Sequence, residues 1–72
     1  MTYNDRLKEL RIDNDNTQED IAKILTTSTQ YYQKYEKGIR PLPIAHLRTL
    51  CIYYKVSADY ILELPKGLNF PR

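Results

Sequence analysis

The chain has 72 residues, of which 42% are hydrophobic and 28% charged, and its formal net charge is only +2. This composition is typical of a small globular domain rather than a disordered segment, and it leaves little core for stability. No apolar run approaches the roughly 18 residues that span a bilayer, and the polar amino terminus does not resemble a signal peptide, so we expect a cytoplasmic protein. We interpret residues 1–72 as one domain, with a core at about 5–62 and a carboxy-terminal tail at 63–72.

The reactive side chains predict neither an enzyme nor a metal protein. The single cysteine, Cys51, cannot form an internal disulfide, and its helical spacing from Leu47 and Tyr54 favours a small core residue over a reactive thiol. The single histidine, His46, lies off that apolar stripe, and we expect it at the solvated surface. One Cys and one His do not make a zinc pattern, and two Gly do not make a phosphate loop, so we expect no metal, no cofactor and no catalytic site.

Residues 4–14 are predicted to form a first helix. Leu7 and Leu10 share one face of it, and Arg11 follows at helical spacing. The polar run that comes next ends this helix, and it contains Asp15, a residue type that tolerates the left-handed backbone conformation.

The stretch 17–38 contains two further helical patterns separated by a polar break. Thr17 can cap the first pattern, and Asp20 can return a hydrogen bond to the Thr17 amide, which makes a capping box. The hydroxylated residues 26–28 disfavour helix, and Ser28 is the natural cap of the second pattern. The apolar face of the first pattern comprises Ile21, Ala22 and Leu25; the second carries Tyr32 and Tyr35 inward and ends at Gly38, which suits a left-handed helix end.

Two more helices are predicted after a loop at 39–43. Pro43 suits the first turn of the fourth helix, which extends to about Lys55. Ser57 is expected to cap a fifth helix at 58–62. The residues expected in the core from these helices are Leu47, Leu50, Cys51, Tyr54, Tyr60 and Ile61.

A helix, a short break and a second helix with a polar outer face make a helix-turn-helix. The run Thr-Gln-Glu-Asp-Ile-Ala at 17–22, the segment 28–34 and the run Tyr-Glu-Lys-Gly at 35–38 resemble, in their order and spacing, the Cro and phage-repressor family of helix-turn-helix proteins, often called XRE-like. The resemblance covers about residues 5–62. It implies an all-α, five-helix, lambda-repressor-like DNA-binding domain.

The sequence departs from this family in the turn between the two helices. Thr26 stands where the family usually has Gly, and a β-branched residue is a poor choice at positive φ. We therefore expect a wider turn, or a second helix that continues further. Ile24 stands where the family is usually polar, and we expect it to pack under Tyr31 or to be exposed.

The polar outer face of the third helix is the candidate DNA-binding surface. Gln side chains can pair with adenine, and Lys can donate to guanine. The resemblance implies that Thr29, Gln30 and Lys34 occupy base-reading positions and that Gln18 holds the phosphate backbone. We expect Lys37 and Arg40 to follow onto phosphates. The remaining candidates on this face are Ser28, Gln33 and Tyr31, of which Tyr31 is expected either to contact DNA or to pack on Ile24.

Two charged residues on inward faces are expected to pair. Arg11 lies on the apolar face of the first helix, and Glu36 follows the inward Tyr35. A charge at either position would be unfavourable without a partner of opposite charge. The family resemblance implies an ion pair between them.

These features together predict a repressor-like transcriptional regulator that binds a palindromic double-stranded DNA operator as a homodimer. The alternative is a helix-turn-helix fold used for protein contact, as in an antitoxin-like or anti-repressor partner. The tail is expected either to form the dimer contact or to fold back onto its own chain. Its apolar residues are Leu64, Leu68 and Phe70, with Ile61 as a further candidate.

Overall fold

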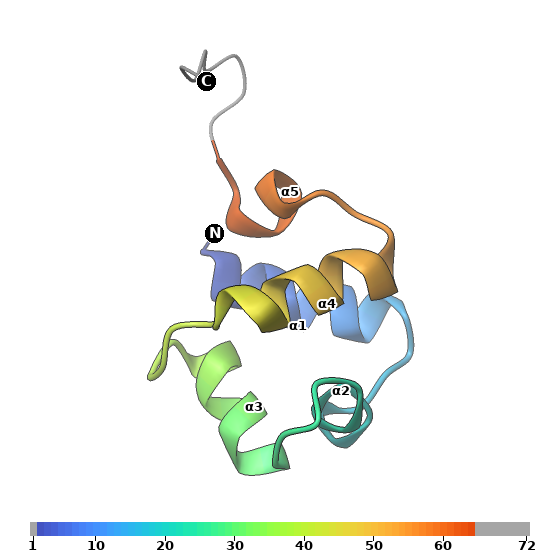
Figure 1. Cartoon of the computed structure of the whole chain (residues 1–72), viewed down its shortest axis with the longest axis vertical. Coiled ribbons are helices and arrows are strands. Elements are labelled where there is room, and N and C mark those ends of the chain that lie inside the picture. The colour runs from blue at the N-terminus through green and yellow to red at the C-terminus, as the bar shows by residue number, and fades with distance from the viewer. Residues whose placement is uncertain (1, 65–72) are drawn as a thin grey trace.

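The computed structural model describes residues 2–64 (Figure 1), which form five helices and no strand. Helix α2 packs on α3, α1 packs on both α3 and α5, and α4 packs on α5. The α2–α3 pair therefore lies at one end of the molecule, and α5 lies at the other. The predicted all-α, five-helix fold is confirmed. The helices are α1 at Tyr3–Asp13, α2 at Gln18–Ile24, α3 at Thr29–Lys37, α4 at Ile44–Tyr54 and α5 at Ala58–Leu62.

Helices α1 and α2 both begin with a capping box. The hydroxyl of Thr17 accepts from the Asp20 amide at 3.0 Å, and the Thr17 amide donates to the Asp20 carboxylate at 2.9 Å, as predicted. Thr2 and Asp5 make the same pair of hydrogen bonds at the start of α1. The first helix was predicted at residues 4–14, so its predicted start and its predicted end are each one residue late. The cap at Thr2 sets the observed start at Tyr3.

The two ends of α3 are confirmed. The Ser28 hydroxyl accepts from the Tyr31 amide at 3.1 Å, and Gly38 closes the helix in the left-handed conformation at a φ of 76°. A Cβ at position 38 would lie 3.4 Å from the Asn4 side-chain oxygen. The side-chain nitrogen of Asn4, Nδ2, donates to the Tyr35 carbonyl at 2.7 Å, and this hydrogen bond ties the start of α1 to the end of α3.

The caps of α4 and α5 agree with prediction except at Pro43. Pro43 is the residue before α4 and has an extended backbone, so it does not form part of the first turn. Lys55 ends α4 in the left-handed conformation at a φ of 58°. The Ser57 hydroxyl accepts from the Tyr60 amide and caps α5, as expected.

The turn between α2 and α3 is tighter than the sequence indicates. Helix α2 ends at Ile24, and Thr26 adopts a φ of 54°, the conformation for which Gly is best suited. The Thr27 amide donates to the Ala22 carbonyl at 2.9 Å and closes the turn. The expectation of a wider turn or a longer helix is therefore wrong. The packing of α2 on α3 imposes the left-handed backbone conformation on Thr26 although its side chain is β-branched.

Thr26→Gly is expected to stabilise the protein. A left-handed backbone costs a non-Gly residue about 1–2 kcal/mol, and Gly removes this strain. Gly also raises the conformational entropy of the unfolded chain, which offsets part of the stabilisation. We expect the free energy of unfolding to rise by about 1 kcal/mol, which raises the melting temperature of a domain this small by about 4–8 °C. Thr27→Gly is the matched control, because Thr27 has no positive φ and should lose stability. A melting temperature for Thr26→Gly at or below that of the native chain contradicts the prediction.

The core lies between α1, α2, α3, α4 and α5, and Tyr32 and Tyr35 are buried in it as predicted. Cys51 and Tyr54 are half-buried against this core, and burial raises the pKa of the Cys51 thiol. Ile24 also packs against the core, so it is not exposed. The core residues are Leu7, Leu10, Ile21, Ala22, Leu25, Tyr32, Tyr35, Leu50 and Ile61.

Two predictions about burial are wrong, and one of the two roles considered for Ile61 is excluded. Tyr60 is 44% exposed rather than in the core, and its ring lies under the Arg6 guanidinium, whose carbon is 4.4 Å from the ring centroid. His46 is half-buried rather than fully solvated, because its ring packs at 5.8 Å from that of Tyr35. Ile61 is fully buried, which confirms its predicted place in the core and excludes its alternative role in a contact with a second copy. Leu64 is 43% exposed, whereas Leu68 and Phe70 fall outside the described residues.

Candidate nucleic-acid interface

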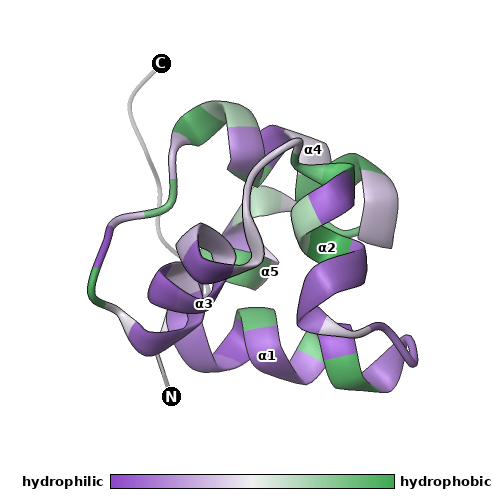
Figure 2. Ribbon diagram, turned by 90° about the horizontal axis from the view of Figure 1, so that it is seen from below, coloured by the Kyte–Doolittle hydropathy of each residue, from purple (hydrophilic) through white to green (hydrophobic). Residues whose placement is uncertain are grey.

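Helix α3 turns a polar face outward. Tyr32 and Tyr35 point into the core and are 0% and 6% exposed, so residues about half a turn away must face solvent. Figure 2 shows α3 coloured mostly hydrophilic. The predicted site residues on or beside this outer face are Ser28, Gln30, Tyr31, Lys37 and Arg40, which are exposed, and Thr29, Gln33 and Lys34, which are half-buried.

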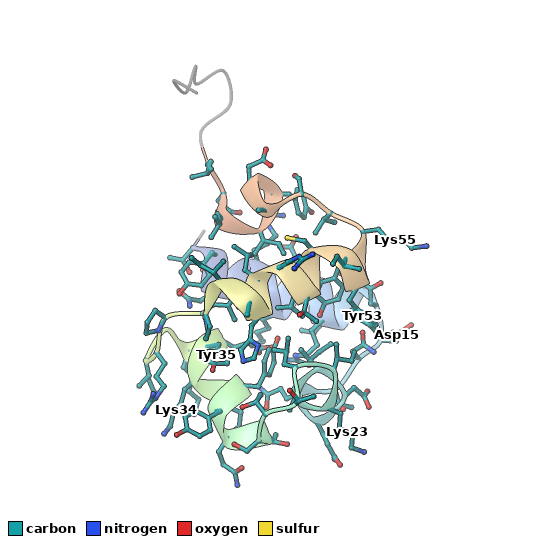
Figure 3. The ribbon with its side chains drawn as sticks, in the orientation of Figure 1. Asp15, Lys23, Lys34, Tyr35, Tyr53 and Lys55 are labelled. Carbon is teal, nitrogen blue, oxygen red and sulfur yellow. The ribbon has the colours of Figure 1, made fainter. Side chains whose placement is uncertain are left out.

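Tyr31 gathers two basic side chains at one edge of this face. The Lys34 ammonium lies 5.3 Å from the centroid of the Tyr31 ring, and the Arg40 guanidinium carbon lies 5.0 Å from it. The segment after α3 stays beside the helix, because the backbone amides of Ile39 and Arg40 both donate to the Lys34 carbonyl. Lys34 projects away from the body of the molecule, whereas Tyr35 points toward α4 (Figure 3). Cation–π contacts of this kind hold the two charges together beside an exposed hydroxyl.

Arg11 and Glu36 form a partly buried ion pair between α1 and α3. The Arg11 Nε donates to one Glu36 carboxylate oxygen at 2.7 Å and Nη2 donates to the other at 3.2 Å, and the side chains are 13% and 4% exposed. Burial alone would raise the pKa of the Glu36 carboxyl, but hydrogen bonds from Arg11 and Gln18 outweigh it and hold the pKa below its usual value. Glu36 is therefore ionised at neutral pH.

Gln18 and Gln33 extend this ion pair toward the surface. The Gln18 side-chain nitrogen donates to Glu36 at 3.3 Å, and the Gln33 nitrogen donates to the Gln18 oxygen at 3.0 Å. This connection was not predicted from the sequence, because Gln18 lies 15 positions from Gln33 and 18 positions from Glu36 in the chain. The only signal in the sequence is that Gln18 begins α2 while Gln33 lies on the flank of α3 next to it.

A second charged cluster at the other end of the molecule was also missed. The Arg6 guanidinium donates to Glu9 at 3.0 Å, to the Tyr60 hydroxyl at 3.1 Å and to the Glu63 carboxylate. These contacts tie α1 to the end of α5. They lie away from α3, so they belong to the scaffold and not to the candidate interface.

The described part of the chain offers no other obvious site. Among residues 2–64, no group of three or more His, Cys, Asp and Glu side chains is placed to hold a metal ion. No helix in that range has the length and apolar character to cross a membrane.

The comparisons with known proteins bear on the same region. A family model described as helix-turn-helix matches residues 7–61, which is more than half of the chain and contains α2 and α3 entire. The comparisons with curated proteins and with solved structures gave no match.

Proposed function

Since the chain belongs to the XRE-type helix-turn-helix family of the Cro and C1 type, which is a family of DNA-binding regulators, we propose that it is a repressor-like transcriptional regulator with a specific operator. The observation that carries this proposal is the polar outer face of α3, presented by the burial of Tyr32 and Tyr35. The N-terminal half of such a helix enters the major groove, where side chains reach base edges. We infer a cytoplasmic location from this role.

The side chains divide by position into two groups. We assign base reading to Thr29, Gln30 and Lys34, because they lie on or beside the outer face of the first two turns of α3. We assign phosphate contacts to Gln18, Lys37 and Arg40, together with the Ser28 and Tyr31 hydroxyls. Phosphate contacts add affinity and salt dependence, whereas base contacts add specificity.

The test is selection of bound sites from a random pool of DNA duplexes. We expect one enriched motif, and we expect the affinity for that motif to fall steeply as the salt concentration rises. The same experiment separates this function from that of a protein-interaction module, which would enrich no motif. Recovery of a random pool after repeated rounds would refute the proposed function.

We further propose that the chain binds DNA as a homodimer. One module this small contacts only a few base pairs, whereas two copies related by a twofold axis read two half-sites about 34–36 Å apart in a palindromic operator. The contact between copies must avoid α3. The end of α5, with the exposed Leu64, satisfies this because it lies at the opposite end of the molecule from the α2–α3 pair (Figure 1).

The prediction is a weak dimer in solution that DNA strengthens. Phe70→Ser, or deletion of residues 64–72, should shift the protein toward monomers, because either change removes apolar surface from the tail. Analytical sedimentation at several protein concentrations measures the shift. A strictly monomeric protein that also binds DNA as a single copy contradicts the dimer. A monomer that unfolds when the tail is deleted indicates instead that the tail folds back onto its own chain.

A further inference from the structure

One chain of hydrogen bonds runs from the partly buried ion pair to the flank of α3, at the edge of its outer face. It starts at Arg11 in α1, passes through Glu36 in α3 and Gln18 in α2, and ends at Gln33. The last two links measure 3.3 Å between Gln18 and Glu36 and 3.0 Å between Gln33 and Gln18. Three helices therefore fix the side chain of one residue on the candidate interface.

The chemistry of Glu36 determines the direction of every link. An ionised carboxylate only accepts hydrogen bonds, so the Gln18 amide must turn its nitrogen toward Glu36. The Gln18 oxygen then faces Gln33, and a carbonyl oxygen also only accepts. Gln33 must therefore turn its nitrogen toward Gln18.

This order cannot be reversed at low cost. Turning the Gln18 amide over would place its oxygen against a carboxylate that is 4% exposed and already held by Arg11. Turning the Gln33 amide over would place two carbonyl oxygens in contact. Two acceptors in contact repel each other, and in a part-buried site water screens that repulsion less than at the open surface, so the network favours one orientation of both amides.

Gln33 consequently has an unused oxygen and one unused hydrogen on its nitrogen. Within residues 2–64, no hydrogen bond occupies its Oε1 atom. In the major groove, adenine and cytosine present an amino group that donates, whereas guanine presents two acceptors and thymine presents an acceptor and a methyl group. Adenine also presents an acceptor beside its amino group, which matches the second hydrogen of Gln33.

We propose, on the premise that α3 reads DNA as described above, that Gln33 is a specificity-determining residue that selects a base with an amino group in the major groove, adenine before cytosine. Gln18 is the positioning residue that enforces this choice. A freely rotating Gln amide can offer its nitrogen to guanine, whereas the orientation held here offers the oxygen.

The first experiment compares base preferences selected from a random duplex pool. The native chain should enrich adenine, or less strongly cytosine, at one position in each half-site. Gln33→Ala should reduce that preference by about 5- to 140-fold at that position alone. Gln30→Ala is the matched control: it removes another glutamine from the same helix, one that makes no side-chain hydrogen bond to residues 2–64, and it should alter a different position. Thermal melting of each variant verifies that it is folded.

The second experiment releases the orientation of Gln33 without removing it. Gln18→Met retains the length of the side chain and removes the oxygen that holds the Gln33 nitrogen. At the position assigned to Gln33, guanine should rise toward the level of adenine, even if the overall affinity falls. A role in stability alone would lower the melting temperature and leave the ratio of adenine to guanine unchanged.

The outcomes separate this inference from the proposed function. A native chain that enriches no motif refutes both. A clear motif that Gln33→Ala leaves unchanged refutes only the role of Gln33. A guanine or thymine at the position that Gln33→Ala alters refutes the orientation, and an unchanged base ratio in Gln18→Met refutes the positioning role of Gln18.

Discussion

Replacing Arg11 with Met is expected to lower the free energy of unfolding by about 3–5 kcal/mol, because it leaves the carboxylate of Glu36 buried without its partner. The Glu36 side chain is only 4% exposed, so little water reaches it, and the Gln18 amide that still donates to it at 3.3 Å is neutral. Arg11 also donates to the Asn16 carbonyl at 3.2 Å, and this bond is lost as well. At about 4 °C or more per kcal/mol for a domain this small, the melting temperature should fall by about 12 °C or more.

The double variant separates the ion pair from simple loss of packing. Adding Glu36→Leu to Arg11→Met removes the stranded charge, so part of the lost stability should return. Lys8→Met is the matched control, because it makes the same substitution on the exposed side of α1 and should change stability by about 0.5 kcal/mol at most. Thermal and denaturant unfolding measure all three variants. Equal melting temperatures for Arg11→Met and Lys8→Met would show that the pair contributes little.

Local patterns were sufficient to predict the helices, because caps and apolar spacing act within one or two turns of the chain. Thr17 with Asp20 marked the start of α2 correctly, and Ser28 and Gly38 marked the two ends of α3. The same Thr-x-x-Asp spacing is present at the start of α1, so the true start of that helix was also visible in the sequence.

Contacts between distant residues were not predictable from such local patterns, and the Arg11–Glu36 pair was expected only because the family resemblance implied it. Arg6 and Tyr60 are 54 positions apart, and the placement of α5 against α1 draws the Tyr60 ring out of the core and under the guanidinium. Thr26 shows the same limit, because its intrinsic preference argues against a positive φ that tertiary packing nevertheless imposes. Gln33 was one of several polar candidates on α3, and no local pattern indicated that the fold would bring Gln18 beside it.

The second large effect is expected in DNA affinity, where loss of a base contact and loss of a phosphate contact on α3 should have different consequences. Changing Gln30 or Lys34 to Ala should cost about 1–3 kcal/mol at the selected site and relax sequence preference, since each is assigned to a base edge. Lys37 is exposed and lies one turn further along α3, where it is assigned to a phosphate. Lys37→Ala should therefore weaken binding to every duplex alike and reduce the salt slope by about one unit.

Titrations of the selected duplex and of a random duplex, each at several salt concentrations, measure both quantities for each variant. Lys37→Ala is the natural control for Lys34→Ala, because both variants remove one positive charge from the same helix. The two should differ in the ratio of selected to random affinity, since only a lost base contact changes that ratio. Lys34 also lies over the Tyr31 ring beside Arg40, a position from which an ammonium can reach a phosphate instead. If Lys34→Ala weakens both duplexes equally, Lys34 belongs with Lys37 and Arg40 among the phosphate contacts, and base reading by α3 rests on Thr29, Gln30 and Gln33.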